Sequence, residues 1–94
     1  MEWTLTQPTS PAVLRVRLAA APGRYTVHIG DPAGTEMVIA QATAIGPFWK
    51  VRALLAHHEE TVTTAKGACQ ALLADVHELF PGARLTPALT KAAA

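Results

Sequence analysis

The stretch that most constrains the fold lies between residues 65 and 80, where apolar side chains recur at the spacing of a helix. Its apolar members fall three and four residues apart and are Ala65, Ala68, Cys69, Leu72, Val76, Leu79 and Phe80. This spacing places them on one side of an α-helix. Thr63 and Thr64 are candidates for its N-cap, and Pro81-Gly82 stops it. A helix with one apolar side has to pack against a second layer, which the rest of the chain must supply.

Two segments before the helix have the alternating pattern of half-buried β-strands. In residues 12–20 and 24–30, apolar side chains alternate with polar or basic ones. The link Ala21-Pro22-Gly23 is short, so the two strands are predicted to pair in antiparallel fashion. A turn at Asp31-Pro32-Ala33-Gly34 then leads into the next segment.

Two further strands are predicted before the helix. Residues 35–44 are apolar on both faces, which predicts a strand covered by the helix on one side and by a second subunit on the other. Residues 48–56 are predicted as the fourth strand, with Trp49 and Leu55 on the covered face. A helix over residues 48–58 is the competing interpretation, because Pro47 suits a first helical turn and many helix formers follow it.

The predicted architecture is therefore an α+β, two-layer domain. It consists of a four-stranded antiparallel meander with one C-terminal helix packed on one face. We expect this single β-β-β-β-α domain to span residues 12–82. Residues 1–11 are expected to be a flexible N-terminal arm, although Trp3 and Leu5 leave open a short edge strand or a contact with a neighbour. Residues 83–94 are expected to be a mostly disordered tail, although Arg84-Leu85 leave open a short ordered segment.

Composition limits which cellular compartment and which kinds of partner are expected for the protein. The chain has 94 residues, enough for one core, and a net charge of +1, which neither requires nor excludes a polyanionic partner. A single cysteine forbids an internal disulfide and fits a reducing compartment. The N-terminus lacks a signal-peptide pattern, and no run approaches the ~20 apolar residues that span a bilayer. We therefore expect a soluble, cytoplasmic protein with no membrane partner.

The face of the predicted sheet that points away from the helix is basic. The candidate binding residues on it are Arg15, Arg17, Arg24, His28, Phe48, Lys50 and Arg52. The acidic residues are expected elsewhere, in the arm, at turns or on the helix. Arginine and lysine neutralise phosphates, and an exposed aromatic ring can stack on a base, so the pattern is compatible with DNA or RNA binding.

Two other interpretations of this basic face stay open. Long charged side chains are ordinary on a solvated sheet face, where they protect strands from aggregation. The face could also meet an acidic protein surface, such as the helix of a second copy in a homodimer.

One part of the chain resembles known DNA-binding domains. The sequence FWKVR, followed by TTAK at the start of a helix, is similar to the small β-sheet-plus-helix domains of phage integrases and plant AP2-type regulators. The resemblance covers residues 46–80 and implies a sheet with one packed helix. The sequence departs from the pattern where those domains have an acidic residue after the threonine, since Lys66 or Gly67 stands there.

No catalytic or metal-binding motif stands out, and no cofactor is expected. The run His57-His58-Glu59-Glu60 is predicted to be a solvated connection, because adjacent turn residues rarely converge on one ion. Cys69 is predicted to be a small core residue. Asp75, His77 and Glu78 are predicted to lie on the helix surface.

The sequence thus predicts a small non-enzymatic binding or regulatory module. Nucleic acid is the sharpest candidate partner. A protein-interaction or homo-oligomeric assembly module is the alternative.

Overall fold

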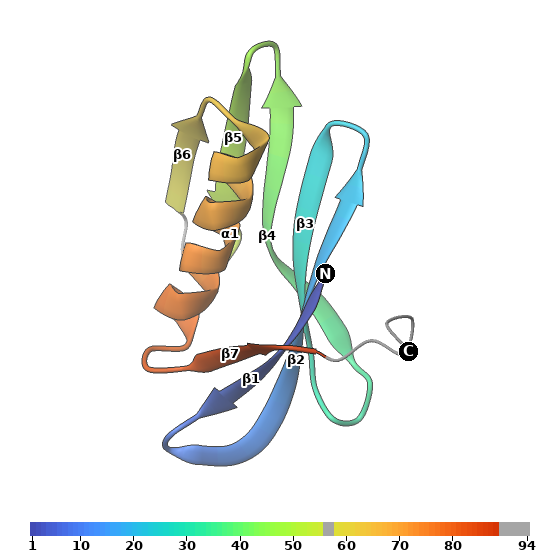
Figure 1. Cartoon of the computed structure of the whole chain (residues 1–94), viewed down its shortest axis with the longest axis vertical. Coiled ribbons are helices and arrows are strands. Elements are labelled where there is room, and N and C mark those ends of the chain that lie inside the picture. Colours follow the sequence, from blue (N-terminus) through green and yellow to red (C-terminus); the bar gives the residue numbers. More distant parts are fainter. Residues whose placement is uncertain (56–57, 89–94) are drawn as a thin grey trace.

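The computed structural model describes residues 1–55 and 58–88. In this part of the chain, one helix lies across one face of a seven-stranded antiparallel sheet (Figure 1). The elements in chain order are β1 (Glu2–Gln7), β2 (Ser10–Ala21), β3 (Arg24–Gly30), β4 (Glu36–Ile45), β5 (Phe48–Ala53), β6 (His58–Val62), α1 (Ala65–Leu79) and β7 (Arg84–Pro87). The sheet order is β6-β5-β4-β3-β2-β1-β7. The α+β class is confirmed, but the expected four strands are too few.

The first strand comes from the segment expected to be a loose arm. Residues 2–7 form β1, which pairs with β2 on one side and with β7 on the other. Leu5 is fully buried and pairs with Leu14. Trp3 and Leu5 thus lie in a strand, as one alternative allowed, but β7 and not β1 is the edge of the sheet.

The other two unexpected strands lie on either side of the helix in sequence. The segment His58–Val62, expected as part of a connection, is β6, while His57 lies outside the described residues. Residues 84–87 of the expected tail form β7, and residues 89–94 also lie outside the described part. β6 and β7 are the two edges of the sheet, so each pairs on one side only.

The fourth predicted segment is a strand and not a helix. β5 pairs with β4 from Ala53 opposite Ala40 to Phe48 opposite Ile45. It ends three residues earlier than expected, and Leu55, which was expected on the covered face, lies in a turn with half of its surface exposed.

A β-bulge explains why apolar side chains do not alternate regularly with polar ones in residues 35–44. Val27 pairs with Ala40 and the next residue, His28, pairs with Val38, so β4 carries one extra residue, Ile39. Ile39 and Ala40 are both buried, because the bulge turns two consecutive side chains toward the core. β4 therefore buries two consecutive apolar residues on the same side of the sheet. Its apolar sequence does not require a second layer on the other side.

The helix begins and ends as its sequence predicts. Thr64 is the N-cap, and its side-chain oxygen accepts a hydrogen bond of 2.9 Å from the backbone N–H of Gly67. The helix ends at Leu79, and Gly82 follows with a φ of 77°.

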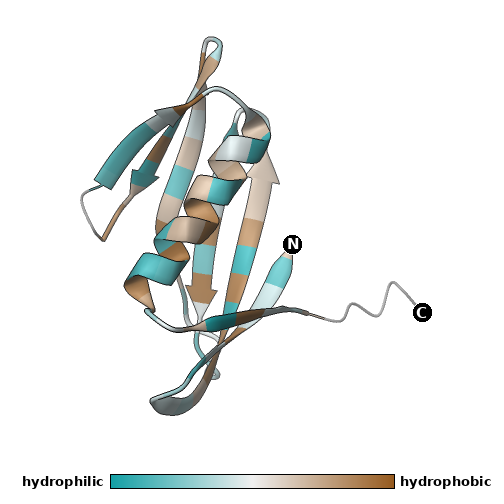
Figure 2. Cartoon of the chain, turned by 60° about the vertical axis from the view of Figure 1, so that its left-hand side comes forward, coloured by the Kyte–Doolittle hydropathy of each residue, from teal (hydrophilic) through white to brown (hydrophobic). Residues whose placement is uncertain are grey.

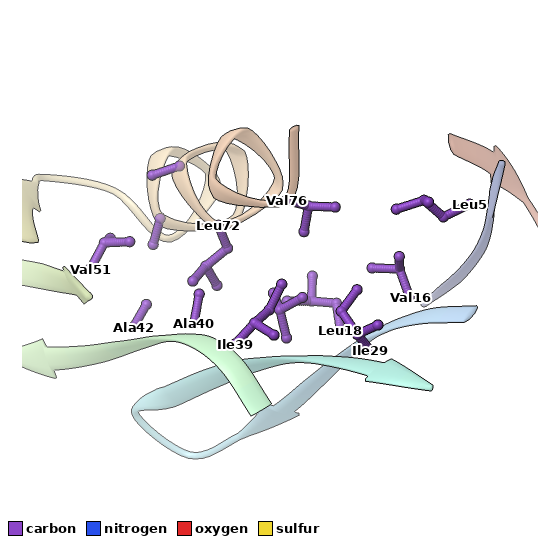
Figure 3. Packing of buried hydrophobic residues seen from close by; sticks show 13 residues of the cluster. Leu5, Val16, Leu18, Ile29, Ile39, Ala40, Ala42, Val51, Leu72 and Val76 are labelled. Carbon is purple, nitrogen blue, oxygen red and sulfur yellow. The ribbon is translucent and has the colours of Figure 1, made fainter. Parts of the chain in front are cut away.

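The core lies between the helix and the sheet. Leu72 points from α1 toward Ala40 and Ile39, and Val76 points toward the same side of the helix (Figure 3), while Val51 belongs to the same cluster. The helix packs on β5, β4 and β3. The small side chains of the buried alanines let it approach the sheet closely, and these alanines are Ala40, Ala42, Ala53, Ala68 and Ala71.

Beyond the helix, the core continues between the first strands of the sheet. Leu5 and Val16 close it where β1 pairs with β2 and β7, below the helix in the view of Figure 1 (Figures 1 and 3). Hydrophobic and hydrophilic bands alternate along the strands, as expected for a sheet covered on one face (Figure 2).

Candidate nucleic-acid interface

Cross-strand pairing determines which side chains share the sheet face opposite α1, called here the open face. Directly paired residues point to the same side of a sheet, and they alternate with the buried positions Val16, Val27 and Val51. The candidate binding residues that this register places on the open face are Arg15, Arg17, Arg24, His28, Phe48, Lys50 and Arg52. The register adds Arg84 of β7, whose partner Thr6 pairs with Val13 two positions before Arg15.

The expectation that the acidic residues lie elsewhere is wrong for three of the seven. Glu2 pairs with Arg17, Glu36 pairs with Gly30, and Glu59 pairs with Arg52, so all three share the open face. They were misplaced because the segments that carry Glu2 and Glu59 were expected to be an arm and a loop. The open face is consequently a mixed surface with an excess of cations.

Two neighbouring rows of paired side chains cross the open face between β3 and β6. The Lys50 row consists of Arg24, Thr43, Lys50 and Thr61. The Arg52 row consists of Thr26, Gln41, Arg52 and Glu59. Each row combines two charged side chains with two hydroxyl or amide groups, which can donate hydrogen bonds to phosphate and base oxygens.

One cation of the open face is held by a carboxylate. Arg17 donates two hydrogen bonds to Glu36, at 3.1 Å from Nε and 2.8 Å from Nη2. These bonds raise the pKa of Arg17 and lower that of Glu36. Glu36 reaches β2 across Gly30 of β3, where an added Cβ would lie 3.6 Å from Cγ of Glu36. Nδ1 of His28 lies 3.7 Å from the same carboxylate. This cluster is internally neutralised and presents little free charge to a ligand.

The cations of the Lys50 and Arg52 rows are held more loosely. Glu59 lies 3.4 Å from Nζ of Lys50 and 3.9 Å from Nε of Arg52, and all three side chains are about half exposed. These three residues are called here the Glu59 clamp. Arg24, at the other end of the Lys50 row, makes no salt bridge with a carboxylate of the described residues.

An apolar patch borders the Lys50 row. Ile45 and Phe48 pair at the end of the β4–β5 hairpin and are 54% and 48% exposed. With Lys50 and Thr61 they line a shallow depression of about 230 Å³. A second depression, of about 200 Å³, continues from Ile45 and Lys50 to the other members of the Glu59 clamp. An exposed aromatic ring therefore lies beside loosely held cations.

The open-face residues of β6 that were missed are assigned by the pairing of β6 with β5, not by a local sequence pattern. In β6, Glu59 and Thr61 alternate with His58, Glu60 and Val62, and only the second set faces the helix side. The alternation was hidden because four consecutive polar residues resemble a loop. Gln41 and Thr43 were passed over because their strand is otherwise apolar.

A buried carboxylate lies away from the open face. Asp75, expected on the helix surface, is only 3% exposed, and its Oδ2 has no hydrogen-bond partner among the described residues. Its Oδ1 lies 3.7 Å from Nδ1 of His58 on β6. Burial raises the pKa of Asp75, the His58 ring lowers it, and the nearby Glu78 and Glu60 raise it further.

The remaining candidates for chemistry are Cys69 and clusters of metal-ligating side chains. Cys69 is half-buried, and burial raises the pKa of its thiol, which disfavours the reactive thiolate. Across residues 1–55 and 58–88, no three His, Cys, Asp or Glu side chains lie close enough together to hold a metal ion.

Comparison with known proteins identifies no relative: no family model, curated protein or solved structure matches the chain. The resemblance of residues 46–80 to integrase and AP2-type domains is limited by β6, which stands between the FWKVR strand and the helix. In the described part of the chain, no helix combines the length and apolarity that crossing a membrane requires.

Proposed function

We propose that this chain is a non-enzymatic binding module that holds a single-stranded nucleic acid on the open face, between β3 and β6. The observation that carries the proposal is the exposed ring of Phe48 beside the Lys50 row. Arg24, Lys50 and Arg52 supply charge for phosphates, and the ring supplies a stacking surface for a base. A single strand fits better than a duplex, because bases in a duplex are already stacked on each other.

The cations of the open face differ in how tightly carboxylates hold them, and this difference favours one position for the ligand. The Arg17–Glu36 cluster is internally neutralised by two short hydrogen bonds, so it contributes little attraction. The Lys50 and Arg52 rows combine the loosely held cations with Thr43, Gln41 and the apolar patch. We therefore place the ligand over these rows, with its backbone along the cations and a base on Phe48.

The proposal is tested by fluorescence anisotropy with a labelled oligonucleotide of about 12 nucleotides. If about three phosphates are neutralised, doubling the salt concentration should weaken binding about fourfold. The double variant Arg24→Glu/Lys50→Glu should lose binding, because it reverses both cations of one row. The single variant Lys50→Glu should weaken binding, and Lys66→Glu is its matched control, since each reverses one exposed lysine and Lys66 lies on the helix. Equal losses in Lys50→Glu and Lys66→Glu would contradict the proposal.

Self-association is the second candidate function. It is favoured by the exposed Ile45–Phe48 pair and by β6 and β7, the two edge strands of the sheet. Sedimentation velocity over a range of protein concentrations tests it. A species that stays monomeric at the highest concentration would count against an assembly module.

A further inference from the structure

We infer that Glu59 competes internally for the place of a nucleic-acid phosphate in the Glu59 clamp. The inference rests on the proposed function and adds a regulating residue to the same surface. Glu59 lies on β6, the outermost strand at one edge of the sheet (Figure 1), and it pairs with Arg52. Its carboxylate contacts Lys50 and Arg52 at once, through different oxygens.

The chemistry of the clamp matches a phosphodiester. A carboxylate and a phosphodiester each present two anionic oxygens, and both are bound by paired Lys and Arg donors. The clamp also borders the depression that reaches Ile45 and Lys50. A strand with one base on Phe48 would therefore bring its neighbouring phosphate toward the position that Glu59 occupies.

The clamp is loose enough for this exchange. Its two N–O distances, 3.4 and 3.9 Å, exceed those of charge-assisted hydrogen bonds, and its side chains are about half exposed. Exposed ion pairs of this kind contribute little to stability, so they separate at little cost. By contrast, the Arg17–Glu36 pair on the same face is joined by hydrogen bonds of 2.8 and 3.1 Å, so we expect it to stay paired.

Binding has two electrostatic penalties under this inference. The cations must first give up Glu59, and the displaced carboxylate then stays beside the incoming phosphate, where like charges repel. Replacing Glu59 by glutamine removes both penalties while preserving the length and shape of the side chain. Glu59→Gln should therefore bind a single-stranded oligonucleotide about fivefold more tightly at low salt.

Glu60→Gln is a closely matched control. Glu60 is the next residue of the same exposed strand, and its removal changes the net charge of the protein equally. It pairs with the buried Val51 and thus lies on the helix side of the sheet. If the inference is correct, Glu60→Gln changes the affinity by less than about twofold, because its charge lies on the other face.

The experiment measures the affinity of wild type, Glu59→Gln and Glu60→Gln for labelled oligothymidylate, with circular dichroism to verify folding. Tighter binding by Glu59→Gln alone supports the inference. If both variants bind equally more tightly, the effect comes from net charge and the inference is wrong. If wild type binds and Glu59→Gln does not bind more tightly, the inference fails while the proposed function stands. If neither wild type nor Glu59→Gln binds, the proposed function itself fails.

Discussion

Replacing Asp75 by asparagine should stabilise the protein at neutral pH. Asp75 is 3% exposed, and within residues 1–55 and 58–88 one of its carboxylate oxygens has no hydrogen-bond partner. A buried polar group without a partner costs about 1–3 kcal/mol, and a charged one costs more. Asparagine preserves the shape but removes the charge. Because its amide also needs acceptors, we expect a net gain of about 1 kcal/mol in the free energy of unfolding, or about 5 °C in Tm.

The gain should depend on pH in a defined direction. Burial raises the pKa of Asp75 above its value in the unfolded chain. Between these two pKa values the folded state binds more protons than the unfolded state, so the stability of wild type falls as the pH rises through this window. Below the unfolded-state pKa both states are protonated and the penalty disappears. The stabilisation by Asp75→Asn should therefore be largest near neutral pH and vanish in acid.

Urea denaturation of both proteins, at about pH 7 and about pH 3, measures this difference. Glu78→Gln is the control, because Glu78 is an exposed carboxylate one turn further along the same helix and should change stability by less than about 0.5 kcal/mol. A loss of more than about 1 kcal/mol in Asp75→Asn at neutral pH would refute the reasoning. It would mean that the carboxylate makes a stabilising contact, for example with a protonated His58.

Three further substitutions test separate parts of the structure. Phe48→Ala should weaken oligonucleotide binding about tenfold through the loss of stacking; unchanged affinity in anisotropy would remove Phe48 from the interface. Leu5→Ala should cost about 3 kcal/mol in urea denaturation, because Leu5 is fully buried in β1; a cost below about 0.5 kcal/mol would match a loose arm. Thr64→Ala should cost about 1 kcal/mol by removing the N-cap bond to Gly67, and Thr63→Ala, which leaves that bond intact, should cost clearly less.

The sequence predicted the parts of the fold in which side chains alternate strongly. Val16 and Leu18 alternate with arginines in β2, and Val27 and Ile29 do so with polar residues in β3, because each strand has one covered and one open face. The helix was equally clear, because its apolar positions keep a 3.6-residue period.

The remaining strands could not be read from local pattern. In β1, Trp3 and Leu5 alternate with threonines, but the nearby Pro8 and Pro11 resemble a loop, and the burial of Leu5 depends on contacts made much later in the chain. β6 has one apolar residue, Val62, so it has no periodic apolar pattern. It is a strand because it pairs with β5. β7 pairs with β1 alone, at the edge of the sheet, so its formation depends on a strand far away in sequence.

The sequence predicted which cations share the open face, but it did not predict that acidic residues lie there too. The alternation of β2, β3 and β5 was enough to place Arg17, Arg24 and Lys50 on a common face. The positions of Glu36 and Glu59 required the pairing of β4 with β3 and of β6 with β5. The burial of Asp75 was missed because β6, which lies beside that part of the helix, was not predicted.

Chemical-shift mapping tests the central claim most directly. In a titration of isotope-labelled protein with oligothymidylate at low salt, the backbone amides of Thr43, Lys50 and Arg52 should shift, while those of Lys66 and Gln70 on the helix should not. Unchanged spectra, or shifts that gather on the helix side instead, would contradict binding on the open face.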